Sequence, residues 1–114
     1  ICSAPEFLKF LLMTIQQKWL KQNDMLELAE MLKALAHSSR ISILLLLTKS
    51  DRGRMTVKSI YEELKMSQPV ISRHLGILRN SGLLLRFSEG STTYYELNTK
   101  NKHAKKIVNC FSSM

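Results

Sequence analysis

The sequence contains little cysteine and no apolar run long enough to cross a membrane. Cys2 and Cys110 stand near opposite ends of the 114 residues, without a CxxC pair or a Cys/His cluster. This argues against a disulfide framework and indicates a cytoplasmic protein with reduced thiols. The apolar stretch 7–15 is interrupted by Lys9 and is far shorter than the roughly 20 residues of a membrane span. We therefore expect neither a signal sequence nor a transmembrane segment.

The sequence also shows no recognisable arrangement of catalytic groups. The sequence has no nucleophile paired with a general base, no glycine-rich loop that could cradle phosphate and no paired carboxylates in a plausible pocket. We expect no enzyme activity and no cofactor.

Acidic residues are scarce relative to basic ones. Nine Asp and Glu stand against 17 Lys and Arg, which gives a net charge of +8 and a pI near 9.8. The excess is +3 over residues 51–82, with six bases and three acids, and +4 over residues 99–114, with four bases and no acid. This balance favours a polyanionic partner.

Residues 56–82 predict two short helices around a tight turn. Thr56 is a candidate N-cap for the first helix, whose apolar residues recur at helical spacing: Val57, Ile60 and Leu64. The turn covers residues 65–67, and Ser67 is a candidate cap for the second helix. Pro69 falls in its first turn, where the missing amide hydrogen costs nothing.

The second helix has an apolar face and a polar face. Its inward residues are Ile71, Leu75 and Leu78, and Gly82 supplies the left-handed conformation that a helix end favours. Small, polar and cationic residues occupy the rest of the surface: Gln68, Pro69, Ser72, Arg73 and Gly76. This is the pattern of a helix-turn-helix, whose second helix enters the major groove of DNA.

Three further helices are expected before this segment. Residues 5–23 form an amphipathic pattern, and Asp24 with Glu27 resembles a capping box that opens the next helix. The expected inner face of that helix is Leu28, Leu32 and Leu35. Ser38 or Ser39 caps a third helix, which is apolar on nearly every side from Ile41 to Leu47 and is therefore predicted to be the centre of the core.

After Gly82 the apolar period changes from 3.6 to about 2, as a strand requires. Two alternating segments flank a turn at residues 88–91, and helix returns over about residues 99–113. Residues 50–54 are expected to form a charged loop. The fold class is mainly α with a small antiparallel β-hairpin wing, a winged helix-turn-helix, in one domain over residues 1–114.

Three segments resemble the ArsR-type family of bacterial winged-helix repressors. They are LAEMLKALAHSSRISIL from Leu28, SQPVISRHLGILRNSGLL from Ser67 and EGSTTYYEL from Glu89. The resemblance implies a homodimer built by the first and last helices, about 5–23 and 99–113. It also implies binding to an inverted-repeat operator in double-stranded DNA and a ligand that lowers DNA affinity.

The candidate DNA-contacting residues lie on the second helix and the wing. They are Ser67, Gln68, Pro69, Ser72, Arg73, His74, Arg79, Arg86 and Ser91. The candidate dimer-interface residues exceed the apolar surface that one small core can cover: Leu8, Leu11, Leu12, Ile15, Trp19, Ile107 and Phe111.

This sequence departs from the family pattern at two places. Many metal-sensing relatives have a Cys-x-Cys pair where this chain has Thr56 and Lys58, neither of which is a soft-metal ligand. Ser91 replaces a basic residue that often follows the Glu-Gly of the wing, which leaves Arg86 as the only cation of the wing.

The histidines and cysteines suggest no metal site. His103 and Cys110 are seven residues apart, about 10 Å along a helix, which is too far to share one ion within a subunit. We expect His103 at a surface or interface, because the last helix lacks the carboxylate and second histidine of an N/O site. His74 is expected to pack or to touch a phosphate, and His37 to belong to a capping turn. A redox disulfide between Cys2 and Cys110 is a less favoured alternative.

These observations favour a dimeric, sequence-specific DNA-binding transcriptional regulator, a repressor, with an unknown effector. The alternative is a winged helix that serves as a protein-interaction module and binds an acidic protein. Salt dependence of DNA binding distinguishes the two.

Overall fold

The computed structural model describes residue 8 and residues 22–113. Over these residues the order of elements is α2 (Gln22–Leu35), α3 (Ser38–Lys49), a 3-10 turn η1 (Asp51–Gly53), β1 (Arg54–Thr56), α4 (Val57–Leu64), α5 (Gln68–Asn80), β2 (Leu84–Glu89), β3 (Thr92–Leu97) and α6 (Lys102–Ser112). The helix expected over residues 5–23 falls almost entirely outside the described residues.

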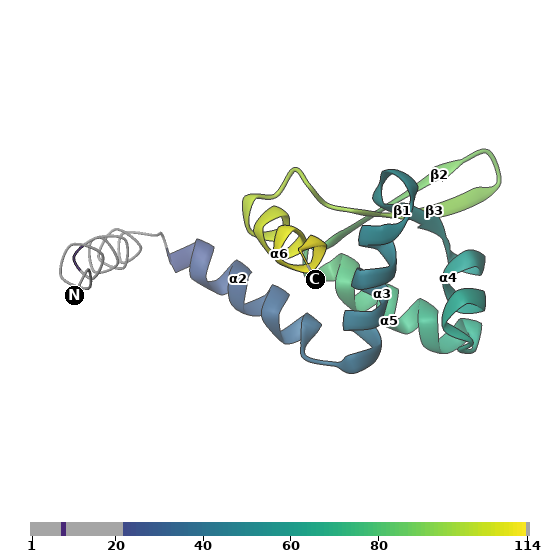
Figure 1. The fold of residues 1–114 in the computed structure, drawn as a ribbon, viewed down its shortest axis with the longest axis horizontal. Coiled ribbons are helices and arrows are strands. Elements are labelled where there is room, and N and C mark those ends of the chain that lie inside the picture. Colours follow the sequence, from purple (N-terminus) through teal and green to yellow (C-terminus); the bar gives the residue numbers. More distant parts are fainter. Residues whose placement is uncertain (1–7, 9–21, 114) are drawn as a thin grey trace.

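Helix α3 forms the centre of the core, as its all-round apolar sequence predicts (Figure 1). Ile43, Leu44 and Leu47 have no exposed surface, and α3 packs against α2, α4, α5, α6 and β3. Burial of each such side chain stabilises the fold by about 1.5–3 kcal/mol. The expected serine cap of this helix is wrong. The N-cap is His37, whose Nδ1 accepts a hydrogen bond from the amide of Ser39 at 3.2 Å.

Helices α4 and α5 confirm the predicted helix-turn-helix. The Thr56 hydroxyl accepts a hydrogen bond from the amide of Ser59 at 3.0 Å and so caps α4. Lys65 adopts a left-handed conformation at the turn, with φ 54° and ψ 44°. The predicted inward residues of α5, Ile71, Leu75 and Leu78, are fully buried. Ser67 occupies the N-cap position of α5, but its side chain makes no capping hydrogen bond.

The wing is larger than the predicted hairpin because a third strand joins it. Strands β2 and β3 pair antiparallel from Leu84 opposite Leu97 to Glu89 opposite Thr92, and β1 pairs with the other edge of β3. The expected loop over residues 50–54 therefore ends in a strand at Arg54. Three residues are too few to show an alternating pattern, so this strand depends on pairing with a segment some 40 residues later.

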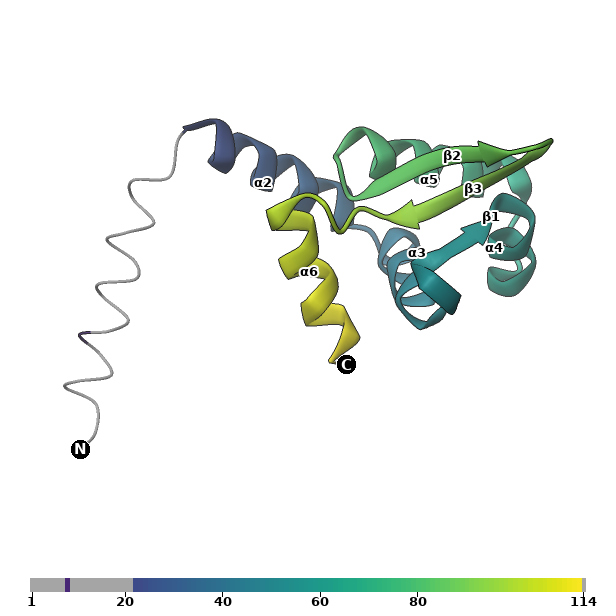
Figure 2. The same cartoon turned by 90° about the horizontal axis from the view of Figure 1, so that it is seen from above.

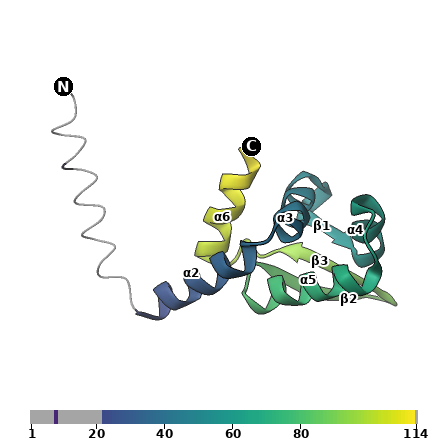
Figure 3. The same cartoon turned by 90° about the horizontal axis from the view of Figure 1, so that it is seen from below.

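Helices α2 and α6 lie side by side at the end of the domain away from the tip of the wing (Figures 1, 2 and 3). Helix α6 begins at Lys102, later than expected, with Asn101 as its N-cap. In the described part of the chain no single helix is long and apolar enough to cross a membrane. Only α2 and α3 taken together reach that length and composition, as a pair bent by 100°.

The expected inner face of α2 is confirmed at Leu35 but wrong at Leu32, because the helix is turned about its axis. Leu32 is 53% exposed, whereas Met31, Ala34 and Leu35 are buried. Asp24 lies within the helix rather than at its cap, and it shares the inward stripe with Glu27, Met31 and Ala34. The two carboxylates face inward because α6 provides their hydrogen-bond partners, which a pattern within α2 alone cannot reveal.

Two glycines give a matched test of backbone conformation. Gly82 has φ +93°, and a Cβ there would lie 3.1 Å from Cε of Met31. We expect Gly82→Ala to lower the free energy of unfolding by at least about 1 kcal/mol. Gly76 is helical, and a Cβ there meets nothing within 4 Å, so Gly76→Ala should raise stability by about 0.5–1 kcal/mol. Urea unfolding of both variants measures the difference, and equal effects would contradict this account of Gly82.

Candidate nucleic-acid interface

An open groove of about 550 Å³ lies between the start of α4, the first turns of α5 and the wing. Its lining is polar and hydroxyl-rich, with Thr56, Val57, Lys58, Tyr61, Gln68, Ser72, Arg86, Ser91, Thr92, Thr93 and Tyr95. Four of the candidate DNA-contacting residues come together here: Gln68, Ser72, Arg86 and Ser91. The groove joins the second helix of the helix-turn-helix to the hairpin that flanks it.

Helix α5 presents two neighbouring rows of exposed side chains. The first row contains Gln68, Ser72 and Arg79, with four residues from the first to the second and seven from the second to the third. At 100° per residue these three lie within roughly 40° of one another around the helix. Pro69 and Arg73 are also exposed and occupy the row farther from the core. Ser67 is exposed at the start of the same helix. Gln68 and Ser72 of the first row line the groove, and the second row faces away from the body of the protein.

Several residues of this surface are not among those predicted from the sequence. Thr56 and Lys58 belong to the start of α4, and Thr92 and Thr93 belong to β3, yet all four line the groove. The sequence singles out Lys58 only because it stands where metal-sensing relatives have a cysteine. Its positive charge at the start of the first helix is nevertheless a usable signal, because lysine side chains commonly contact phosphate oxygens.

The charges of this surface are free to meet a polyanion. In the described residues Lys58, Arg73, Arg79 and Arg86 form no ion pair. The one acidic residue at the tip of the wing, Glu89, is paired with Arg54 at 3.3 Å. The Arg54 guanidinium also lies over the rings of Phe87 and Tyr94, at 5.4 and 5.2 Å, and so ties β1 to the hairpin.

A family model described as "Bacterial regulatory protein, arsR family" matches residues 37–85, which run from the cap of α3 to the start of β2. An uncharacterised helix-turn-helix transcriptional regulator of Methanocaldococcus jannaschii is 40% identical over 81 residues, 70% of this chain and 89% of that protein. The chain belongs to the arsR family.

Other members and structures agree with this assignment. The arsenical resistance operon repressor of Escherichia coli strain K12 is 44% identical over 68 residues, 60% of this chain but only 56% of that repressor. The crystal structure of the transcriptional repressor PagR of Bacillus anthracis has a TM-score of 0.69 at 30% identity, covering 79% of this chain and 98% of that one. A homodimeric winged helix-turn-helix DNA-binding domain of Mycobacterium bovis shares the fold, with a TM-score of 0.67 at 24% identity over 82% of this chain and 83% of that one.

The arsR assignment confirms the predicted fold and class of function. The relatives are named as transcriptional regulators rather than enzymes, and the solved structures are winged helix-turn-helix proteins. The family resemblance that the three sequence segments carried is therefore confirmed.

One candidate DNA-contacting residue, His74, does not lie on the surface formed by α5 and the wing. It is 8% exposed and faces α3, where its Nδ1 accepts a hydrogen bond from Nε of Arg40 at 3.2 Å. The ring of His37 lies 4.7 Å away, between centroids. His74 therefore anchors α5 to the start of α3 and does not line the groove.

Burial lowers the pKa of His74 below its usual value, and the charges of His37, Arg40 and Arg73 lower this pKa further. The geometry agrees with a neutral ring, because the nitrogen that faces Arg40 must accept a hydrogen bond and cannot carry a proton.

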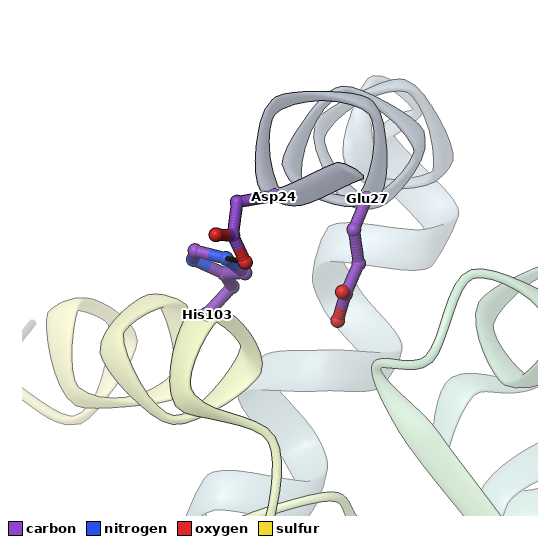
Figure 4. Close-up of side chains that lie close together, drawn as sticks. All are labelled: Asp24, Glu27 and His103. Carbon is purple, nitrogen blue, oxygen red and sulfur yellow. Dashed lines mark hydrogen bonds and ion pairs between the residues drawn. The ribbon is translucent and has the colours of Figure 1, made fainter. Parts of the chain in front are cut away.

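A second group of polar residues joins α2 to α6, far from the groove (Figure 4). Nε2 of His103 lies 3.3 Å from Oδ1 of Asp24, and Nζ of Lys102 lies 3.3 Å from the same oxygen. Hydrogen bonds from His103 and then Lys102 lower the pKa of Asp24 below its usual value. His103 is 7% exposed in this protomer and is thus not a surface histidine. The carboxylates that α6 lacks are supplied by α2, with Glu27 beside Asp24.

The lowered pKa of His74 predicts a pH dependence of stability. As the pH falls through about 6.5, the unfolded chain takes up a proton at His74 before the folded protein does. The stability contributed by neutral His74 is therefore present above that pH and is lost as the pH falls below it. We expect the Tm of the wild type to fall more steeply between pH 7.5 and 5.5 than that of His74→Gln, whose amide oxygen still accepts from Arg40. His37 and His103 remain in both proteins, so parallel melting curves across this range would contradict the assignment.

Proposed function

We propose that this chain is a homodimeric repressor that acts in the cytoplasm, binds an inverted-repeat operator in double-stranded DNA and is released by an effector. The observation that carries the proposal is the open groove, where the cations Lys58 of α4 and Arg86 of the wing lie beside the polar side chains of α5. Neither cation forms an ion pair within the described residues. Repression is supported by the names of two relatives, the Escherichia coli arsenical resistance operon repressor and PagR.

In this proposal α5 enters the major groove and the wing contacts the backbone beside it. Gln68, Ser72 and Arg73 provide hydrogen-bonding groups at the exposed face of α5, and Arg79 continues the row. A guanidinium such as that of Arg73 can reach the O6/N7 edge of guanine, whereas Arg86 on the wing is suited to a phosphate. Three further residues border the same surface. Ser67 and Ser91 offer hydroxyl donors, and the ring of Pro69 allows close packing.

Dimerisation is supported by apolar surface that the protomer leaves uncovered. On α2 three large side chains are about half exposed: Met25 at 49%, Leu26 at 59% and Leu32 at 53%. Leu8 is 58% exposed, while Leu11, Leu12, Ile15 and Trp19 lie outside the described residues. Ile107 and Phe111 are half-buried against the core and add less free surface than the sequence suggested. The homodimeric Mycobacterium bovis domain with the same fold also supports a dimer.

Sedimentation at micromolar concentration should therefore give twice the 13.1 kDa mass of the chain. We expect Leu32→Glu to shift the protein to monomer, because a charge would be buried without a partner at the interface. Leu85→Glu is the matched control, since Leu85 is 36% exposed on β2, away from this surface, and should leave the dimer intact. A wild-type monomer at that concentration would rule out the proposed assembly.

The alternative function, a protein-interaction module, predicts a different response to salt. A dimer that neutralises about six to ten phosphates should lose roughly 10³- to 10⁵-fold in DNA affinity between 50 and 200 mM salt. A flat response on every duplex would favour the interaction module instead.

Two arginines separate base recognition from backbone binding. Arg73→Ala should weaken operator binding by roughly 1–3 kcal/mol per half-site and relax the preference at one base pair. Arg86→Ala should weaken binding about equally on all sequences and reduce the salt slope by about one per contact. Operator and random-duplex titrations measure both, with circular dichroism to verify folding.

The control for this pair is Lys33→Gln, because Lys33 is an exposed cation on α2 that pairs with Glu30, away from the groove. This variant should bind like the wild type. Unchanged operator affinity in Arg73→Ala would mean that α5 is not the recognition helix.

A further inference from the structure

The junction between α2 and α6 brings three metal-binding side chains together. Asp24 and Glu27 lie one turn apart on the inward stripe of α2, and His103 faces them from the first turn of α6 (Figure 4). One ligand atom from each residue can be chosen so that all three lie within 4.8 Å of one another. None of these residues contributes to the DNA-binding groove.

The distances suit a small divalent ion. In a tetrahedral zinc site with bonds of about 2.0–2.1 Å, neighbouring ligand atoms lie about 3.3 Å apart. Nε2 of His103 and Oδ1 of Asp24 already have this separation, at 3.3 Å. A carboxylate oxygen of Glu27 lies within 4.8 Å of both atoms, so this side chain must move closer to complete a triangle of ligands.

The donor set selects the class of metal. One imidazole and two carboxylates suit zinc and similar divalent ions, whereas soft ions require thiolates that this junction does not offer. Two carboxylates also balance the charge of a divalent cation. We propose that Asp24, Glu27 and His103 bind one divalent ion of the zinc class between α2 and α6, with water in the fourth position.

The surrounding residues are compatible with this role. Lys102, which contacts Asp24 at 3.3 Å, has a side chain that is 62% exposed, so its ammonium can move into solvent when a metal enters. Asn101 donates a hydrogen bond to Oε1 of Glu27, while its own Oδ1 accepts from the amides of His103 and Ala104. Metal-binding carboxylates are commonly held in place by such a hydrogen bond.

Without a metal the same groups form an ion-pair contact between two helices, so the experiment must separate the two roles. A tag-free protein with Cys2→Ser and Cys110→Ser removes thiolate binding as a source of zinc affinity. Zinc is titrated against a chromophoric chelator, and thermal melting is followed with zinc and with excess chelator. We expect one zinc ion per chain and a Tm that rises with zinc concentration.

The variants preserve shape and remove ligand charge. Asp24→Asn and Glu27→Gln keep a side-chain oxygen towards His103 and Asn101, and each should weaken zinc affinity at least about tenfold. Glu30→Gln is the matched control, because Glu30 is on the exposed face of α2, 66% exposed and paired with Lys33, and it should bind zinc like the parent. Thermal melting in excess chelator shows whether each variant is folded. If Asp24→Asn does not fold, Glu27→Gln still provides the test.

Two results would overturn the proposal. One is the absence of stoichiometric zinc binding by the thiol-free parent at micromolar concentration. The other is zinc affinity in folded Glu27→Gln equal to that of the parent, which would leave the junction as an ion-pair contact only. Neither result bears on operator binding, which is tested by Arg73→Ala.

Discussion

Helix α3 is apolar on most sides, so the chain must cover it with other elements, and this requirement determines where each of them lies. Ile43, Leu44 and Leu47 are fully buried because α2, α4, α5, α6 and β3 all pack against the same helix. The helix-turn-helix is thus one wall of the core rather than an appendage. Its outer surface is free for DNA only because its inner surface is committed to α3.

Two ends of the molecule are separated by this core, and their charged groups are arranged differently. Among the described residues, Arg73, Arg79 and Arg86 of the α5 and wing surface form no ion pair, and the carboxylate of Glu89 at the tip of the wing is paired with Arg54. The α2 and α6 end has two carboxylates that face inward and are met by His103, Lys102 and Asn101. Within the described residues Asp24, Glu30 and Glu89 are ion-paired, whereas the cations Lys58 and Arg86 of the groove are not.

Several features that depend on neighbouring residues follow correctly from the sequence, although the serine cap expected for α3 does not. The turn between α4 and α5, the cap at Thr56 and the buried stripe of α5 each depend on residues within a few positions, and each is confirmed. The strand β1, the rotation of α2 and the burial of His103 depend on partners 40 to 80 residues away, so no local pattern could indicate them. His74 shows the same limit, since its partner Arg40 is 34 residues earlier, on α3.

The same packing gives a physical route between the two ends. Helix α6 packs on α3, and α3 packs on both α4 and α5, while Arg40 at the start of α3 holds α5 through His74. Because protein interiors are close-packed, a shift of α6 on α3 is not absorbed by empty space and must be taken up by neighbouring side chains. An ion that ties α2 to α6 would then act on α5 through α3. By thermodynamic linkage, the factor by which the ion changes DNA affinity equals the factor by which DNA changes ion affinity. Such coupling is measurable as a change in zinc affinity on adding operator, which Glu27→Gln should abolish and Glu30→Gln should preserve.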